Sequence, residues 1–287
     1  MNPSPTTRWK SILAWTSSLL VLLTASIAIA DDEIASATEE PEHTEQAPEE
    51  SEDLSAEEII DRAMARNSLG FESGRAQVTL LVYDRAGERR ERSLDVRSKR
   101  QNERSRTLMS LTNPAEVRGQ AFLFVENPEG TDDMWMYVPA FDVTRRVEGN
   151  QRRSSFLGSH FTFADLESRD LRDAQYRRLS DESIGDHSVY VIQATPKTPA
   201  ESDYGRVVAY IRKTDHIPLR VRFYDKEGDI AKTLFSEKIN TTDGDNSYVE
   251  QMTLRAEDGG YTTIRITALD TDVDLPDSIF DREELGR

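Results

Sequence analysis

The sequence predicts a mainly β fold of the α+β class, in which one amphipathic helix precedes a large antiparallel sheet in a single domain. Three observations lead to this prediction. Apolar residues recur at helical spacing early in the ordered region, about a dozen strand-like segments follow, and turn sequences rich in Gly, Asp and Asn separate most of them. Successive strands joined by short turns pair antiparallel, so we expect a meander.

Residues 1–30 have the pattern of a secretory signal peptide. Arg8 and Lys10 precede an apolar stretch over residues 12–29, which ends in an Ala-Ile-Ala cleavage pattern. We therefore expect cleavage before Asp31 and export of the remaining chain as a soluble protein. An uncleaved membrane anchor is the alternative, because the stretch reaches the lower length limit of a membrane span.

Most of the negative charge lies in one short segment. The formal net charge is -17, yet residues 31–61 hold fourteen acidic side chains and no Lys or Arg, which leaves residues 62–287 with 34 basic and 39 acidic groups. Residues 31–53 are poor in apolar side chains and should form an acidic disordered leader, which we interpret as a solvating segment rather than an interaction arm. The absence of cysteine excludes disulfides, thiolate metal sites and cysteine nucleophiles.

The folded domain should span residues 54–287 and begin with a helix. Ser55 and Glu58 have the spacing of a capping box, and Leu54 can pack against Ile59 as a hydrophobic staple. The apolar residues that follow keep helical spacing until a glycine supplies a stop. The pattern predicts one amphipathic helix of about four turns.

The rest of the domain should form the sheet. The expected strands cover residues 78–83, 93–97, 107–111, 120–126, 134–138, 143–147, 176–179, 188–194, 206–212, 219–224, 231–235, 248–255 and 261–267. Apolar side chains alternate with Arg, Thr or Tyr at residues 219–224 and 264–268, which is typical of a sheet wetted on one side. A sheet of so many strands tends to curl, so we expect a concave apolar face and a cavity.

Aromatic side chains gather between Trp135 and Phe163, although Pro139, Gly149 and Gly158 indicate loops in this region. Loops that carry many aromatic side chains need an apolar surface to cover. The region is therefore predicted to be a lid over the apolar face of the sheet.

A lipid-acting hydrolase that uses Ser159 or His160, with Asp165, is one alternative for the same region. Adjacent Ser and His side chains diverge in a strand, and no G-x-S-x-G elbow exposes a nucleophile, so we expect no enzymatic activity. The four histidines are scattered without an H-x-x-x-H pair, and no glycine-rich loop opens a helix. We therefore expect neither a metal nor another cofactor.

Basic side chains cluster from Arg89 to Arg106, where eight basic groups stand against three acidic ones. Nucleic-acid binding is one functional interpretation of this cluster. We instead expect this cluster to form the outward polar face of two strands. The chain is expected to be exported, its overall charge is acidic, and carboxylates are interleaved with the basic groups. Docking to an acidic partner or to anionic lipid headgroups is an intermediate alternative.

Three ordered motifs carry a family resemblance. They read W-x-Y-x-P-A at residues 135–140, Arg-Arg at 145–146 and F-x-G-S-x-F-T-x-x-D-L at 156–166, after N-P-A-E-V-R-G at 113–119. In these motifs the chain resembles the LolA-like family of periplasmic outer-membrane lipoprotein-sorting proteins, over roughly residues 56–275. The branch of this family that carries the three motifs commonly has Asp where this chain has His160 and Glu where it has Ala164, so the chain departs from the branch at these two positions.

The resemblance implies an unclosed antiparallel half-barrel with short helical lids over a hydrophobic cavity. It also implies a monomeric periplasmic carrier of a lipid or of the acyl chains of a lipoprotein, in transient contact with membranes and associated with an envelope export pump. No nucleic acid is expected as a partner. An adaptor that binds an envelope transporter without carrying cargo is a further alternative.

Two groups of residues are candidates for the site. The candidate cavity residues, placed on guessed strand parity, are Leu80, Val82, Phe122, Phe124, Trp135, Tyr137, Val221, Phe223, Ile264 and Ile266. The candidate lid, headgroup or partner residues are Arg145, Arg146, Phe156, Phe161, Phe163 and Asp165. The two arginines are expected to meet a headgroup or a partner, and Asp165 is expected to fix the lid by hydrogen bonding.

Overall fold

The structure is a computed structural model. It describes residues 54–64, 73–101, 104–127, 130–167, 174–199, 202–241, 247–271 and 273–286, all within one compact unit that spans Glu52–Arg287. The signal peptide expected at residues 1–30 and the acidic leader expected at residues 31–53 lie outside the described residues. In the part of the chain that is described, no helix has both the length and the apolar character needed to span a membrane.

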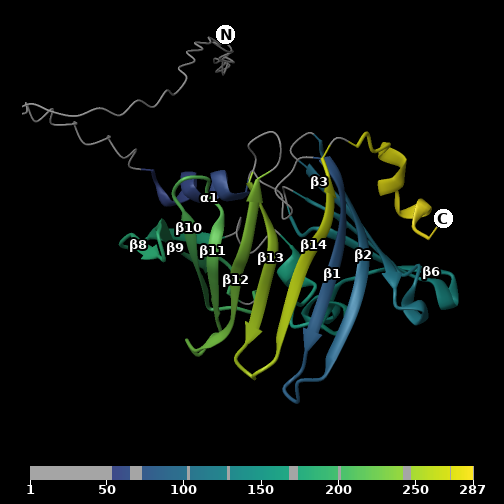
Figure 1. The fold of residues 1–287 in the computed structure, drawn as a ribbon, viewed down its shortest axis with the longest axis horizontal. Helices are drawn as coiled ribbons and strands as arrows, with labels where there is room; N and C mark the ends of the chain where they lie inside the picture. The colour runs from purple at the N-terminus through teal and green to yellow at the C-terminus, as the bar shows by residue number, and fades with distance from the viewer. Residues whose placement is uncertain are drawn as a thin grey trace, which may run out of the picture. The chain divides into compact units, whose positions relative to one another are not determined.

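The described chain contains one α-helix, a set of strands and short 3-10 turns (Figure 1). The helix and strands are α1 Ala56–Met64, β1 Ser73–Tyr83, β2 Arg89–Gln101, β3 Arg104–Asn113, β4 Ala121–Val125, β5 Asp133–Val138, β6 Val143–Arg146, β7 Ala174–Arg178, β8 Glu182–Ile184, β9 His187–Pro196, β10 Arg206–Arg212, β11 Pro218–Tyr224, β12 Ile230–Thr241, β13 Ser247–Ala256 and β14 Tyr261–Asp270. The 3-10 turns are η1 Ala115–Val117, η2 Pro139–Phe141, η3 Gly149–Arg153, η4 Phe156–Gly158, η5 Ala164–Leu166, η6 Asp277–Phe280 and η7 Arg282–Glu284.

All the strands belong to one antiparallel sheet, as the sequence predicted. The order is β6-β5-β4-β3-β2-β1-β14-β13-β12-β11-β10-β9-β7, with β8 paired to β9. Each strand pairs with its neighbour in sequence except where β1 meets β14, where Leu80 lies opposite Ile264, and where β7 meets β9. The sheet is not closed, because β6 and β7 are its two edges. Of the strands, β8 was not predicted, because three residues are too few to show alternation.

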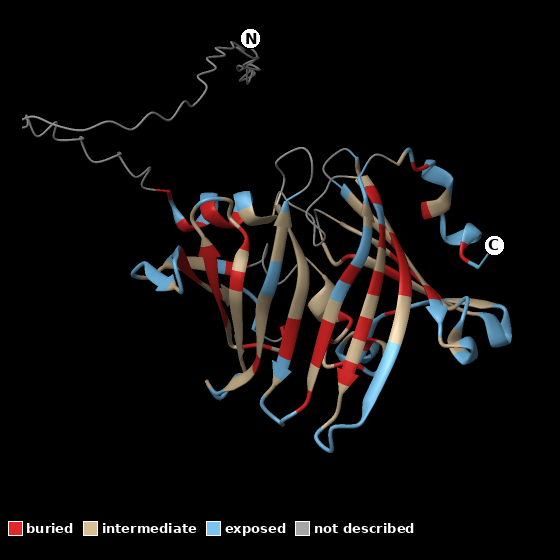
Figure 2. Cartoon of the chain, viewed as in Figure 1, coloured by how far each residue is buried: buried red, intermediate tan, exposed pale blue. Residues whose placement is uncertain are grey.

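One face of this sheet is mostly apolar along its length. We call it the inner face, defined by Leu80 and Val82 on β1. The register carries this face along the sheet, since Val82 lies opposite Thr262, which lies opposite Leu254, which lies opposite Leu234. Figure 2 shows the resulting alternation of buried and less buried residues along the central strands. The curled, one-sided sheet predicted from the alternation is confirmed.

Helix α1 covers the part of the inner face formed by β9 and β10. Ile59 and Ile60 are buried against Ile192 and Ile211. The predicted capping box is present, because the Glu58 amide donates to Ser55 Oγ at 3.2 Å and the Ser55 amide donates to Glu58 Oε2 at 2.9 Å. The hydrogen bonds from Ser55 lower the pKa of the Glu58 carboxyl. The capping box therefore defines where α1, the first element of the domain, begins.

The outer face is polar in the middle of the sheet and apolar near both ends. On β13 and β14 it carries Thr253 and Thr263, whose hydroxyls lie 2.9 Å apart. Near one end, Leu108 and Leu123 pack against Phe280 of the C-terminal segment. The C-terminal turns η6 and η7 thus cover part of the face that the sequence assigned to solvent.

Trp135 and Tyr137 lie on this outer face, so their predicted place in the cavity is wrong. Both pack against the C-terminal segment, where the guanidinium carbon of Arg282 lies 5.1 Å from the centre of the Trp135 ring. Their neighbours Met134 and Met136 occupy the inner positions of β5. Because β5 is covered on both faces, every position after Asp133 carries an apolar or aromatic side chain, and the sequence does not reveal the parity of the strand.

Candidate functional site

The segment of residues 147–166, which we call the lid, connects β6 to the region before β7 and covers the inner face. It contains the turns η3, η4 and η5 and folds back on itself where Ser155 pairs with Thr162. The Phe156 amide donates to the Phe161 carbonyl at 2.8 Å. Leu157 and Gly158 have φ values of +56° and +72°, and these left-handed conformations reverse the chain at the tip. A lid is therefore present, but only the later part of the stretch predicted from Trp135 to Phe163 belongs to it, because the earlier part forms β5, η2 and β6.

Aromatic rings join the lid to the inner face. The ring of Phe122 on β4 lies 5.0 Å from that of Phe156 and 5.9 Å from that of Phe163, measured between centroids. Phe156 and Phe163 meet edge to face at 5.4 Å, and Phe161 is buried in the same cluster. Edge-to-face geometry is favourable for aromatic pairs. The three lid phenylalanines thus occupy the apolar surface that the sheet alone would leave open.

A buried ion pair fastens the base of the lid. Asp165 Oδ2 lies 2.5 Å from the ammonium of Lys232 on β12, and only 3% and 9% of their side chains are exposed. The same carboxylate accepts a hydrogen bond from the hydroxyl of Tyr204 at 2.7 Å and another from the amide of Thr162 at 2.6 Å. The Lys232 ammonium also lies 5.4 Å from the centre of the Phe223 ring. Asp165 therefore holds the lid by hydrogen bonding, as expected, and by an ion pair that the sequence did not reveal.

His160 forms a second attachment, at the tip of the lid. Its backbone amide and its ring Nδ1 both contact the hydroxyl of Thr262 on β14, at 3.0 and 2.8 Å. A side chain at Gly260 would come within 2.1 Å of Nε2 of this ring, so the contact requires glycine there. Burial lowers the pKa of the His160 imidazole; the charge of Arg90 acts in the same direction, partly offset by Asp258. The neutral ring therefore fits this site.

A pocket of about 330 Å³ lies between the lid and the sheet, and we call it the lid pocket. Its apolar wall combines Phe122 and Met136 of the sheet with Leu157 and Phe163 of the lid, and Val117 of η1 closes one side. The polar wall includes Arg90 and Arg92 of β2, together with Gln120, Gln151 and Ser155. An apolar pocket with a few polar groups at its border is the usual form of a small-molecule site. Phe122 and Phe163 were among the site candidates predicted from the sequence, but the other lining residues were missed, and several of these come from turns.

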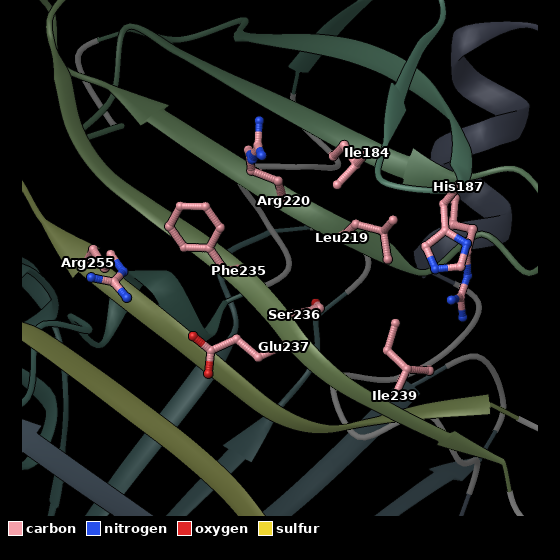
Figure 3. A pocket seen from close by; sticks show the side chains of 10 residues that line it. Ile184, His187, Leu219, Arg220, Phe235, Ser236, Glu237, Ile239 and Arg255 are labelled. Atoms are coloured by element: carbon pink, nitrogen blue, oxygen red, sulfur yellow. The ribbon is translucent and has the colours of Figure 1, made fainter.

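A larger pocket of about 670 Å³, which we call the outer pocket, lies on the opposite face (Figure 3). It is formed by β11 to β13 and by the hairpin of β8 and β9. Its cations already have partners, because Arg212 pairs with Asp215 at 2.6 Å and the Arg220 guanidinium lies between the rings of Tyr210 and Phe235. Such stacking explains why the buried Nε of Arg220 has no hydrogen-bond partner among the described residues. We therefore take the lid pocket as the candidate site.

Apart from Trp135 and Tyr137, the candidate cavity residues lie on the inner face and divide into three groups. The inner-face cluster is the group of buried apolar side chains that joins the inner face to the lid phenylalanines, and it contains four of the candidates: Leu80, Val82, Phe122 and Ile266. Three more pack against that cluster and are partly buried: Phe124, Phe223 and Ile264. Val221 lies further along the same face, against the clusters of α1 and Tyr204. Only Phe122 of the ten lines the lid pocket, and contact with cargo stays a prediction for all of them.

Arg145 and Arg146 are exposed on the edge strand β6. Arg146 forms an ion pair with Asp133, and its guanidinium carbon lies 5.9 Å from the centre of the Trp135 ring. Arg145 is opposite Met136 in the register and therefore on the side of the lid. A headgroup or partner role for the two arginines stays a prediction.

The residues of the hydrolase alternative are engaged in structural contacts. The Ser159 hydroxyl accepts a hydrogen bond from the Phe161 amide at 3.2 Å, whereas the His160 ring faces Thr262. In the described ranges no group of three or more His, Cys, Asp or Glu side chains could hold a metal ion. The arrangement fits a binding surface better than a nucleophile and its base.

Comparisons with solved structures agree with this architecture. A domain named for outer-membrane lipoprotein sorting, from Vibrio parahaemolyticus, is 26% identical with a TM-score of 0.74, over 81% of this chain and 100% of that one. A DUF1329 family protein from Desulfovibrio piger is 27% identical with a TM-score of 0.72, over 80% and 98%. A LolA superfamily protein from Nitrosomonas europaea, 22% identical with a TM-score of 0.64 over 81% and 100%, shares the fold.

The fold is thus that of the LolA-like, outer-membrane lipoprotein-sorting class, which confirms the resemblance seen in the sequence. A family model described as "-like: Uncharacterized protein" matches residues 103–287, more than half of the chain, and the chain belongs to that family. No curated protein matches the sequence.

The first prediction concerns the ion pair that holds the lid. Asp165→Asn leaves the Lys232 ammonium buried without a counter-charge, so the free energy of unfolding in urea should fall by about 3–5 kcal/mol. The double change Asp165→Leu with Lys232→Met removes both charges and should recover most of the loss. As a control, Lys238→Gln removes an exposed ion pair with Glu250 and should cost at most about 1 kcal/mol. Equal losses for Asp165→Asn and Lys238→Gln would contradict the buried anchor.

The second prediction concerns pH. The folded protein lowers the pKa of His160 below its usual 6.5. Between the folded-state pKa and pH 6.5, the unfolded chain therefore binds more protons than the folded one. The contribution of His160 to stability should be complete above about pH 6.5 and decline as the pH falls towards the folded-state pKa. Urea unfolding at several pH values should therefore give a smaller loss on acidification for His160→Asn than for the unmodified protein. His187→Asn, at an exposed site, is the control and should behave like the unmodified protein.

Proposed function

We propose that the protein is a periplasmic, non-enzymatic carrier that holds a lipid, or the acyl chains of a lipoprotein, on the inner face of the sheet beneath the lid. The observation that carries the proposal is the lid pocket, where an apolar wall formed by both sheet and lid ends in polar groups. The domain acts as a monomer in this proposal, in transient contact with the membranes that supply and receive the cargo.

The energetic need for such a surface is large. Burial is worth about 0.8 kcal/mol for each methylene, so an acyl chain of about fifteen carbons costs roughly 12 kcal/mol to leave in water. The inner face offers apolar side chains that are only partly covered, among them Phe124, Phe223 and Ile264. A chain that displaced part of the lid could pack on these residues.

The polar contacts that hold the lid lie at separate places along it, which suits it to opening in stages. Apart from the aromatic cluster, Asp165 holds its base and His160 holds its tip. In η3, the Arg152 guanidinium donates to the Asp132 carbonyl at 2.6 Å and Arg153 pairs with Asp203 at 2.7 Å. Release of the His160 contact would free the tip while the base remained attached. This arrangement supports reversible loading, which a carrier needs, rather than permanent burial of a ligand.

The proposed location rests on the N-terminal sequence and on the class of fold. The signal-peptide pattern of residues 1–30 supports export, and the similar domain from Vibrio parahaemolyticus is named for outer-membrane lipoprotein sorting. Cleavage before Asp31 would leave the domain behind its acidic leader. An envelope export pump is the proposed membrane partner, as the family resemblance implies.

The third prediction tests the lid pocket with a matched pair of variants. Val117→Glu places a carboxylate in the pocket wall, whereas Ala115→Glu adds the same charge at an exposed position of the same turn η1. Because a buried charge opposes an acyl chain, Val117→Glu should weaken binding of a fluorescent fatty acid at least about tenfold, a difference of 1.4 kcal/mol. Ala115→Glu should bind like the unmodified protein. The proposal fails if the unmodified protein does not bind the probe, or if Val117→Glu binds it equally well.

A further inference from the structure

Two arginines extend the apolar row of the inner face at the mouth of the lid pocket. On β2, Arg90 lies opposite Val82 and Arg92 lies opposite Leu80, in the same alternation that places Leu94 opposite Val78. All three partners on β1 are buried in the inner-face cluster. The side chains of Arg90 and Arg92 therefore belong to the face beneath the lid. This corrects the sequence interpretation, which assigned the whole basic cluster to an outward polar face.

Within the described residues these two charges have no counter-charge, unlike several cations near them. Lys232 is paired with Asp165, Arg75 and Arg97 both pair with Asp95, and Arg89 pairs with Glu91. Neither Arg90 nor Arg92 forms an ion pair within the described residues; the Arg92 guanidinium donates to the backbone carbonyl of Glu91 at 3.0 Å. Their charge is thus available to a ligand.

The spacing of Arg90 and Arg92 along β2 brings their two positive charges close together. Alternate residues of a strand point the same way and stand about 7 Å apart, so the two guanidinium groups can reach a common anion. At the tip of the lid, a side chain at Gly158 would lie 3.6 Å from the Arg90 guanidinium, which shows how near the lid comes to it.

We propose that Arg90 and Arg92 bind the anionic end of an acyl cargo whose hydrocarbon chain lies against Phe122, Met136 and Leu157. The ligand class is a long-chain amphiphile with a carboxylate or phosphate at its head. Guanidinium groups hold such oxyanions through paired hydrogen bonds, and an apolar wall beside them strengthens the attraction. This inference rests on the proposed carrier function and adds the chemistry of the headgroup.

The experiment uses three ligands with the same chain: hexadecanoate, hexadecyl phosphate and hexadecanol. Each displaces a neutral environment-sensitive dye such as Nile red from the full-length mature protein at neutral pH. We expect the two anions to bind at least about tenfold more tightly than the alcohol, with a preference that weakens as salt is added. Preference for the carboxylate alone would assign the site to fatty acids, and preference for both anions would include phospholipid headgroups.

The variants separate this inference from the carrier proposal. Arg90→Gln with Arg92→Gln should abolish the preference for anions and leave the affinity for hexadecanol unchanged, whereas Lys at both positions should retain the preference. The control, Arg85→Gln with Arg89→Gln, removes the same charge from the same hairpin and should bind like the unmodified protein. Circular dichroism confirms that each variant is folded. Equal binding of all three ligands to the unmodified protein would overturn the headgroup site alone, and failure of all three to bind would overturn the carrier as well.

Discussion

The structure depends on the need to cover one extended, mostly apolar face of the sheet. The register aligns apolar residues from β5 through β1 and β14 to β9 on the same side of the sheet, and the sheet does not close on itself. An exposed apolar area of this extent would be costly in water and prone to aggregation. Two unrelated segments share the task of covering it: helix α1 at one end and the lid at the other.

Different interactions hold the two covers: aliphatic contacts hold α1, whereas polar contacts also hold the lid. This difference explains why only the lid is suited to opening for a ligand. Helix α1 is held by buried aliphatic contacts of Ile59 and Ile60, which give way only when the helix unfolds or leaves as a unit. The lid adds polar attachments at Asp165 and His160, and polar contacts can be weakened by protonation or by a competing charge. The lid is therefore the part of the cover that a ligand or a membrane surface could displace.

Much of the architecture was readable from local sequence. Alternation predicted the strands and the one-sided sheet, because the central strands face water on one side, and the Ser55 cap marked the start of the helix. Aromatic residues in a region of Gly and Pro predicted the lid. These features depend on residues close together in the chain, where spacing alone carries the information.

The rest depends on contacts that local spacing does not encode. Trp135 and Tyr137 were placed on the wrong face because β5 is apolar on both sides, and Arg90 and Arg92 were misassigned because β2 begins with charges on both sides. The pairing of Asp165 with Lys232 joins residues 67 positions apart, and the cover of the outer face by η6 needs the C-terminus to return to β3. Such partners become visible only once the register is known.

The most direct test of the account is mass spectrometry of small molecules extracted from the protein after gentle purification from the periplasm. We expect an acyl-chain amphiphile with an acidic headgroup, near one molecule for each protein chain, and a marked loss of it in the Val117→Glu variant but not in Ala115→Glu. Recovery of the protein with no acyl compound, or with the same amount in both variants, would contradict the claim that the covered inner face is a lipid-binding surface.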